Sequence, residues 1–173
     1  QARRRGAAIL IAKEPMKFSD FVAVDAIRSN IDADTKEGVI REMASALVDA
    51  GKIPAADLDG IVKAIMKRED LGTTGIGRGV AIPHTKHPSV DRLVGTVAVS
   101  QEGIDFQSLD GDPVHLFFLL VSPPEQRGQH LRALENIARQ LRDDAFCREL
   151  KAAKGPVDIQ HLLEAADNHG MVS

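Results

Sequence analysis

Apolar residues recur every three or four positions in two early segments, which is the period of one face of an α-helix. In the first segment these residues are Val39, Ile40, Met43, Ala44, Leu47 and Val48. Asp34 and Glu37 have the spacing of a capping box, and glycine, here Gly51, is a common helix stop. A helix is therefore expected between Asp34 and Gly51. A second amphipathic helix is expected after Pro54, ending near residues 68–70. Its inward face would contain Leu58, Ile61, Val62 and Ile65.

Three later segments have the composition of β-strands. Val80–Ile82 is short and is cut off by Pro83, whereas Leu93–Val99 is rich in β-branched residues. Val114–Val121 is almost continuously apolar, which is typical of a strand buried on both faces. Residues 72–79 precede the first strand, and their four glycines predict a loop rather than a regular element.

Helical patterns return after the last strand, over Gln129–Leu141, Asp144–Lys154 and Val157–Ala166. Helices on either side of a group of strands predict one α/β domain, with a mixed parallel and antiparallel sheet flanked by helices on both faces. We expect this domain to span residues 16–173. Residues 1–15 combine three arginines with a short apolar run, and we expect a flexible or cloning-derived arm rather than a targeting signal.

Composition excludes several classes of function. The 22 Lys and Arg residues against 25 Asp and Glu residues give a net charge of -3, which argues against nucleic-acid binding. Trp and Tyr are absent, so an aromatic stacking platform for bases or sugars is difficult to build. The single cysteine, Cys147, indicates a reducing compartment, which we take to be the cytoplasm. No apolar run reaches the roughly 20 residues needed for direct membrane insertion.

The chain contains six histidines, at positions 84, 87, 115, 130, 161 and 169. His84 follows a short strand and a proline directly after the glycine-rich segment, so its ring is held by rigid backbone. A neutral imidazole nitrogen there could attack phosphorus. The alternative is a strand-end histidine that only hydrogen-bonds to backbone. We expect His115 to be hydrogen-bonded at the start of its strand, and His161 and His169 to be solvated.

His130, His87 and Arg68 each have two interpretations. His130 lies in the first turn of a predicted helix, where it could help to hold an anion or could simply pack against the protein body. Arg68 ends the second helix beside the glycine-rich segment, where it could bind phosphate oxygens or remain a solvated helix end. His84 and His87 have a His-x-x-His spacing, but no third ligand accompanies them, so a zinc site is disfavoured. The glycine-rich segment also lacks the Gly-Lys-Ser/Thr ending of a nucleotide-binding loop.

The run from Arg68 to His84 reads REDLGTTGIGRGVAIPH. This run closely resembles the active-site signature of the fructose/mannitol-type enzyme IIA domain of the bacterial phosphoenolpyruvate-dependent phosphotransferase system. The resemblance extends from about Phe18 to about Ala166. It includes the strand entry at Asp112–Val114 and the helix start at Gln129–Leu131. Within the family, the chain looks most like the free-standing nitrogen-related enzyme IIA proteins, although a free-standing sugar-specific enzyme IIA would look almost the same.

This resemblance implies the fold, a phosphotransferase activity and the site residues. His84 would be phosphorylated by a histidine-phosphorylated carrier protein of the HPr type, with His130 as the second active-site histidine and Arg68 on the phosphate side. No cofactor is implied. The phosphoryl group would pass to a cysteine of a IIB protein or serve as a regulatory state. The alternative is a protein-interaction module switched by phosphorylation. Thr85 stands where the family more often has a smaller residue.

A surface that accepts a carrier protein should be apolar with a charged rim. Ile76, Val80 and Ile82 flank the path of the chain to His84. Of these, Ile76 is expected to be the best candidate for exposure, because it lies between glycines, whereas Ile82 is expected to belong to the core.

Overall fold

One strand, β5 (Val114–Ser122), lies at the centre of the fold. The computed structural model describes residues 16–172 and the side chains of residues 16–169, so the expected arm at residues 1–15 lies outside the described residues. Eight of the nine residues of β5 are buried. The expectation of a strand covered on both faces is therefore confirmed.

Both edges of β5 are paired. Along one edge, β2 (Val80–Ala81) and β3 (His84–Lys86) run parallel to β5, and β1 (Gly75–Gly77) pairs antiparallel with β2. Along the other edge, β4 (Val94–Ile104) runs antiparallel to β5. The predicted mixed sheet is thus confirmed, and β5 connects its parallel and antiparallel parts.

The glycine-rich segment departs from expectation, because residues 75–77 form β1 rather than part of a continuous loop. The tip of the β1–β2 hairpin is Gly77-Arg78-Gly79, and all three residues have positive φ angles, of 100°, 60° and 78°. Glycine tolerates this backbone region, so the glycines shape the turn instead of preventing pairing. A Cβ atom on Gly75 would lie 2.5 Å from the Ser108 hydroxyl oxygen, so a close approach of backbone also requires glycine there.

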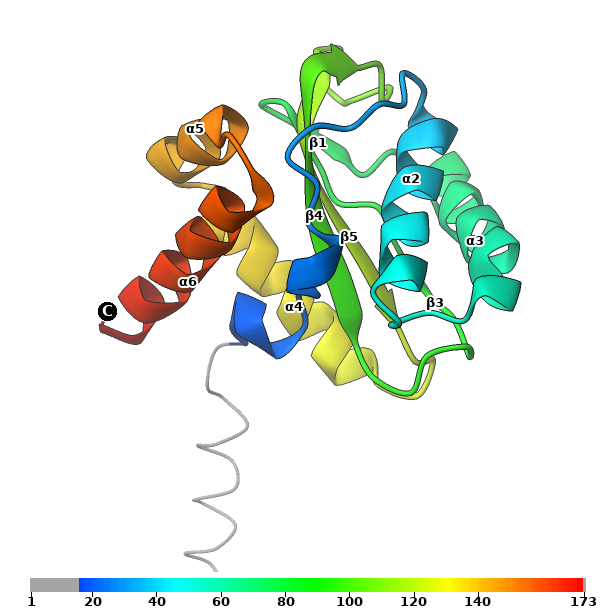
Figure 1. Cartoon of the computed structure of the whole chain (residues 1–173). Helices are drawn as coiled ribbons and strands as arrows, with labels where there is room; N and C mark the ends of the chain where they lie inside the picture. The colour runs from blue at the N-terminus through cyan, green and yellow to red at the C-terminus, as the bar shows by residue number, and fades with distance from the viewer. Residues whose placement is uncertain (1–15, 173) are drawn as a thin grey trace, which may run out of the picture.

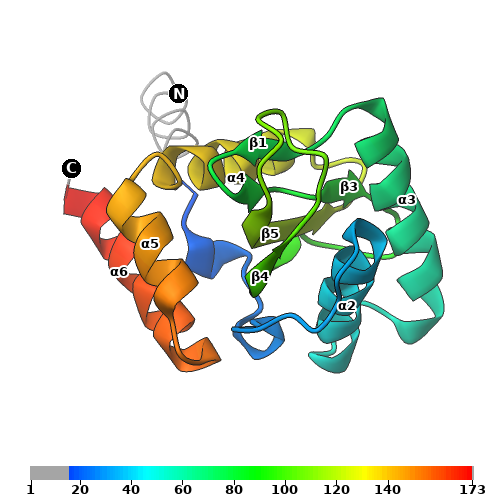
Figure 2. The ribbon, with the colours of Figure 1, turned by 90° about the horizontal axis from the view of Figure 1, so that it is seen from above.

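Within residues 16–172, five α-helices cover the two faces of the sheet (Figures 1 and 2). On one face lie α2 (Lys36–Asp49) and α3 (Leu58–Leu71). On the other face lie α4 (Arg127–Gln140), α5 (Asp144–Ala152) and α6 (Pro156–Val172). The α/β architecture with helices on both faces is confirmed, although α6 extends beyond the expected Val157–Ala166.

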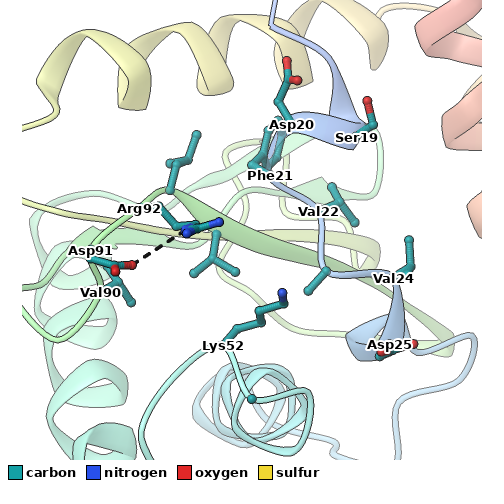
Figure 3. Close-up of a pocket in the computed structure, with 14 residues that line it drawn as sticks. Ser19, Asp20, Phe21, Val22, Val24, Asp25, Lys52, Val90, Asp91 and Arg92 are labelled. Carbon is teal, nitrogen blue, oxygen red and sulfur yellow. Dashed lines mark ion pairs between the residues drawn. The ribbon is translucent and has the colours of Figure 1, made fainter.

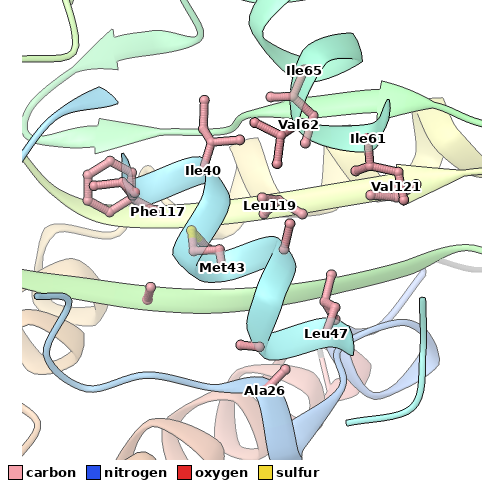
Figure 4. Packing of buried hydrophobic residues seen from close by; sticks show 14 of the residues in the cluster. Ala26, Ile40, Met43, Leu47, Ile61, Val62, Ile65, Phe117, Leu119 and Val121 are labelled. Carbon is pink, nitrogen blue, oxygen red and sulfur yellow. The ribbon is translucent and has the colours of Figure 1, made fainter. Parts of the chain in front are cut away.

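Alternate residues of β5 belong to two separate cores. Phe117, Leu119 and Val121 pack with residues of α2 and α3, as Figure 4 shows. Leu116, Phe118 and Leu120 pack with residues of α4, α5 and α6 on the opposite face. Burying apolar side chains of this size stabilises the fold by about 1.5–3 kcal/mol each. The two cores therefore fix β5, and with β5 the short strands that pair with it.

The capping box expected at Asp34 is wrong by one residue. Thr35 is the residue before α2, and its hydroxyl oxygen accepts a hydrogen bond from the Gly38 N–H at 3.1 Å. Thr35 has the extended backbone conformation usual for this position. Asp and Thr are both common residues before a helix, and the backbone conformation decides which side-chain oxygen reaches the free N–H.

We predict that Thr35→Ala lowers the free energy of unfolding by about 1 kcal/mol, because one N–H at the start of α2 loses its partner. Asp34→Ala should change it by less than about 0.5 kcal/mol, as is usual for an exposed position. Urea denaturation of both variants provides the measurement. A larger loss for Asp34→Ala would contradict the assignment of the cap.

Candidate functional site

His84 is the first residue of β3, and its ring is half-buried. Its Nδ1 atom lies 2.7 Å from the Ile82 carbonyl oxygen. A carbonyl can only accept, so Nδ1 carries the proton and donates it. The other ring nitrogen, Nε2, is then unprotonated in the neutral ring, and it has no hydrogen-bond partner among residues 16–169. The hydrogen bond to backbone expected from the structural interpretation is present, and it leaves free the nitrogen that a nucleophile would use.

The surroundings of His84 favour its neutral form. Burial lowers the pKa of His84 below its usual 6.5, whereas the hydrogen bond to Ile82 raises it. The positive charge of Arg68 lowers the pKa further. The burial effect is the largest, so the ring is neutral at neutral pH.

His130 lies beside His84. The two ring centroids are 5.4 Å apart and the ring planes are tilted by 58°. His130 is in the first turn of α4, is only 5% exposed, and its Nδ1 is hydrogen-bonded to the Ser122 hydroxyl group. Burial lowers the pKa of His130 to about 4, and the charges of His84 and Lys86 contribute. The structure therefore brings the two histidines together with both rings neutral.

Arg68 lies in the last turn of α3, and its Nη1 donates a hydrogen bond to the Gly72 carbonyl oxygen at 2.9 Å. The positive charge of Arg68 contributes, after burial, to the lowered pKa of His84. Of the three residues expected at the site, His84 and His130 are therefore in ring contact, and Arg68 acts on His84 through its charge. Together they form an electropositive surface beside an unprotonated nitrogen, which is suited to holding a phosphoryl group.

Residues 20–166 match the family described as "Phosphoenolpyruvate-dependent sugar phosphotransferase system, EIIA 2". The chain belongs to this family. The recognition made from the Arg68–His84 run is confirmed, and the mixed sheet between helical layers is the arrangement of this EIIA 2 domain.

The chain is similar both to nitrogen regulatory proteins and to a fructose-specific component of the EIIA family. A nitrogen regulatory protein of Bradyrhizobium diazoefficiens is 36% identical over 148 residues, which cover 86% of this chain and 95% of that protein. A fructose-specific EIIABC component of Bacillus subtilis is 34% identical over 88% of this chain but only 24% of that protein. The crystal structure of the nitrogen regulatory protein IIA-Ntr from Neisseria meningitidis superposes with a TM-score of 0.75 at 27% identity, covering 84% of this chain and 98% of that one.

Two further residues of this EIIA site were not found from the sequence. Ser122 is fully buried at the end of β5 and holds the His130 ring. Lys86 is exposed, and its charge lowers the pKa of both His84 and His130. The signal for Ser122 was a lone hydroxyl group at the end of an apolar strand. The signal for Lys86 was its two-residue spacing from His84, which puts both side chains on the same face of a strand.

His87, His115 and Cys147 make contacts away from the His84–His130 pair. The Nδ1 atom of His87 lies 2.7 Å from the Ser89 hydroxyl oxygen, and that of His115 lies 2.9 Å from the Ser100 carbonyl oxygen, as expected for His115. Among residues 16–169, no group of three His, Cys, Asp or Glu side chains could hold a metal ion. Cys147 is buried in α5, and burial raises its pKa, so it is not a reactive thiolate.

A cleft of about 580 Å³ lies elsewhere, between the segment 19–25 and the loop before β4 (Figure 3). Lys52 and Arg92 point into it, but His84, His130 and Arg68 are not among the residues that line it. The histidine site is therefore separate from this cleft. In the described part of the chain, no helix combines the length and the apolarity of a membrane span.

We predict a pH-dependent stability that depends on His130. An unfolded histidine binds a proton near pH 6.5, whereas folded His130 does so only near pH 4. The unfolded chain therefore binds more protons between these values, and the free energy of unfolding should decrease as the pH falls from about 6.5 to about 4.

The variant His130→Gln should show a weaker decrease over this range in urea denaturation, because its amide can still bond to Ser122 without titrating. His161→Gln, on the exposed face of α6, is the matched control and should follow the wild type. Equal pH dependence of wild type and His130→Gln would contradict the assigned environment of His130.

Proposed function

We propose that the protein is a phosphocarrier of the phosphotransferase system. In this proposal His84 accepts a phosphoryl group from a histidine-phosphorylated, HPr-like carrier protein. It then passes the group to a cysteine of a IIB protein or keeps it as a regulatory state. The observation that carries the proposal is the Nδ1 hydrogen bond to Ile82, which leaves Nε2 as the free nucleophilic atom beside Arg68 and His130.

The transfer balances without a cofactor. The lone pair of His84 Nε2 attacks phosphorus, the P–N bond of the carrier breaks, and its electron pair returns to the imidazole of the carrier. The proton on His84 Nδ1 stays in place, and the Ile82 carbonyl oxygen stabilises the positive charge that spreads over the phosphorylated ring. Reversing these steps towards a thiolate of a IIB protein releases the group again.

Positioning and charge supply the catalysis in this proposal, as in phosphoryl transfer generally. The guanidinium group of Arg68 and the ammonium group of Lys86 offset negative charge on the phosphoryl oxygens. We assign the Ser122 hydroxyl as the donor to Nδ1 of His130 in this proposal, so that His130 would hold its own proton on Nε2 and could donate it to a phosphoryl oxygen. A neutral His130 can do this without repelling the proton on the neighbouring His84 ring.

The alternative function is a regulatory module whose partner binding changes when His84 is phosphorylated. The similarity to nitrogen regulatory proteins along nearly their whole length favours this alternative over sugar transport. A phosphoryl group adds nearly two negative charges to the surface around His84, which is enough to break an apolar contact. A chase of the phosphorylated protein with candidate IIB proteins separates the two, because a carrier loses its phosphoryl group rapidly and a switch retains it. Both functions place the protein in the cytoplasm and require neither nucleic acid nor a cofactor.

We predict that His84→Ala abolishes phosphorylation while the fold persists, because the ring is half-buried at a strand end and not part of either core. Incubation with phosphoenolpyruvate and the general carrier proteins, followed by mass spectrometry, provides the measurement, and circular dichroism checks the fold. Phosphorylation of the variant at the normal rate would show that His84 is not the acceptor.

We predict that His130→Ala and Arg68→Ala still accept the phosphoryl group but do so about tenfold to a hundredfold more slowly. Both side chains are proposed to offset charge rather than carry the group. A single donor in an enclosed site changes the rate by about a hundredfold to a thousandfold, and a donor at a site open to solvent changes it less. Single-turnover kinetics should show normal transfer for the control Arg148→Ala, an exposed arginine on α5. Unchanged rates in both test variants would remove these residues from the catalytic site.

The apolar residues considered for carrier docking differ in exposure. Ile76 is 49% exposed on β1, whereas Val80 and Ile82 are buried. The sheet register places Ile76 about three strand residues, roughly 10 Å, along β5 from His84. This separation is within one protein interface of standard size.

We predict that Ile76→Asp raises the carrier concentration for half-maximal transfer about fivefold, which corresponds to roughly 1 kcal/mol of lost contact. The melting temperature should change little, since the side chain is half-exposed. Val157→Asp, a similarly exposed apolar position on α6, is the matched control and should leave transfer unchanged. A large drop in melting temperature for Ile76→Asp would instead assign Ile76 to the core.

A further inference from the structure

Glu69 is a buried carboxylate that the proposed reaction does not use directly. It is only 4% exposed, although its neighbours Asp70 and Leu71 in the last turn of α3 are exposed. The Nζ atom of Lys36, from the first turn of α2, lies 2.9 Å from Glu69 Oε1. Lys36 also lies over the Phe106 ring, 4.7 Å from its centroid. Burying an ion pair costs desolvation free energy, so a role for this pair beyond stability is worth seeking.

The Glu69 carboxylate binds the segment that leads to His84. Its two oxygens accept the Thr74 N–H at 3.1 and 3.2 Å, and Oε2 also accepts the Thr74 hydroxyl proton. Thr74 is itself buried, at 5% exposure. The carboxylate therefore fixes the N–H and the hydroxyl group of Thr74, and the ion pair with Lys36 orients this carboxylate.

Thr74 connects the carboxylate to the nucleophile through two further hydrogen bonds. The Thr74 carbonyl oxygen accepts the Ile82 N–H at 3.1 Å, and the Ile82 carbonyl oxygen accepts from His84 Nδ1 at 2.7 Å. Pro83 lies between Ile82 and His84 and has no N–H, so it offers no backbone donor there. The position of the Ile82 peptide groups thus depends on Thr74 on one side and determines the His84 ring on the other.

We propose that Glu69 is a positioning residue for His84, which acts through Thr74 and Ile82 to hold the proton on Nδ1 and keep Nε2 free. The inference rests on the proposed function, because the free Nε2 matters only if His84 is the acceptor. The Lys36–Glu69 pair does not touch the phosphoryl group. It fixes the backbone whose carbonyl selects the tautomer.

Two double variants isolate the acceptor group of Glu69. Lys36→Met/Glu69→Leu removes the carboxylate without leaving a buried unpaired charge, a change that proteins often tolerate. Lys36→Met/Glu69→Gln is its matched control, because the amide oxygen can still accept the Thr74 N–H. If the Lys36–Glu69 pair only stabilised the fold, both double variants would change the His84 tautomer to the same extent.

The measurement is the tautomer of the unphosphorylated His84 ring, read from its nitrogen chemical shifts and two-bond proton couplings in NMR. The wild type and the Gln control should show the Nδ1–H tautomer. In Lys36→Met/Glu69→Leu the ratio of Nε2–H to Nδ1–H forms should rise about fivefold to tenfold, the effect of one lost hydrogen bond. The transfer rate at saturating carrier should fall in proportion to the remaining fraction of the Nδ1–H form, with the half-saturating concentration unchanged.

An unchanged tautomer ratio in a folded Lys36→Met/Glu69→Leu variant overturns the proposal. If that variant does not fold, Thr74→Val decides, since it removes only the hydroxyl that donates to Glu69. A shifted ratio supports the proposal and a wild-type ratio overturns it. Because the tautomer is read without phosphorylation, a failure of His84 to accept a phosphoryl group would contradict the proposed function and leave this result intact.

Discussion

The site depends on the hydrogen bond from His84 Nδ1 to the Ile82 carbonyl oxygen. A neutral imidazole has one protonated and one free nitrogen, so whichever nitrogen is bound to a carbonyl determines which one can attack. The bond exists because β2 and β3 both pair with β5, with Pro83 between them, which turns the Ile82 carbonyl towards the ring. The two apolar cores on the faces of β5 therefore serve the chemistry by fixing the strand against which this short segment is aligned.

Burial and charge then determine the state of the two rings. Burial keeps the rings of His84 and His130 neutral, while the positive charges of Arg68 and Lys86 lower the pKa of His84 and the Glu69 carboxylate partly offsets them. In the proposed transfer, an anion on a partner protein would meet donors and a nucleophile already in place, so little reorganisation would be needed. The charge of the site depends on pH, because protonation of the neutral His130 ring would place a further positive charge beside the His84 ring.

The sequence predicted the layers of the fold well, because they follow from local patterns. The uninterrupted apolar run of β5 required two covering layers, and the helical periods supplied them. It could not predict β1, because four glycines indicate a loop until the pairing with β2 is known. Lys86 and Ser122 were missed for a related reason: their roles depend on strand register and on the position of α4, which bring them to the two histidines. His84, His130 and Arg68 were proposed as site residues because the motif resemblance pointed to them, whereas position alone left each with a structural alternative.

The most direct measurement of the central claim is the isomer of the phosphohistidine. The protein would be phosphorylated with phosphoenolpyruvate and the general carrier proteins, and the attachment point on His84 would be read from proton–nitrogen and phosphorus couplings in NMR. The hydrogen bond to Ile82 predicts phosphorylation at Nε2, with the proton retained on Nδ1. Phosphorylation at Nδ1, or at another residue while His84 stays unmodified, would contradict the account.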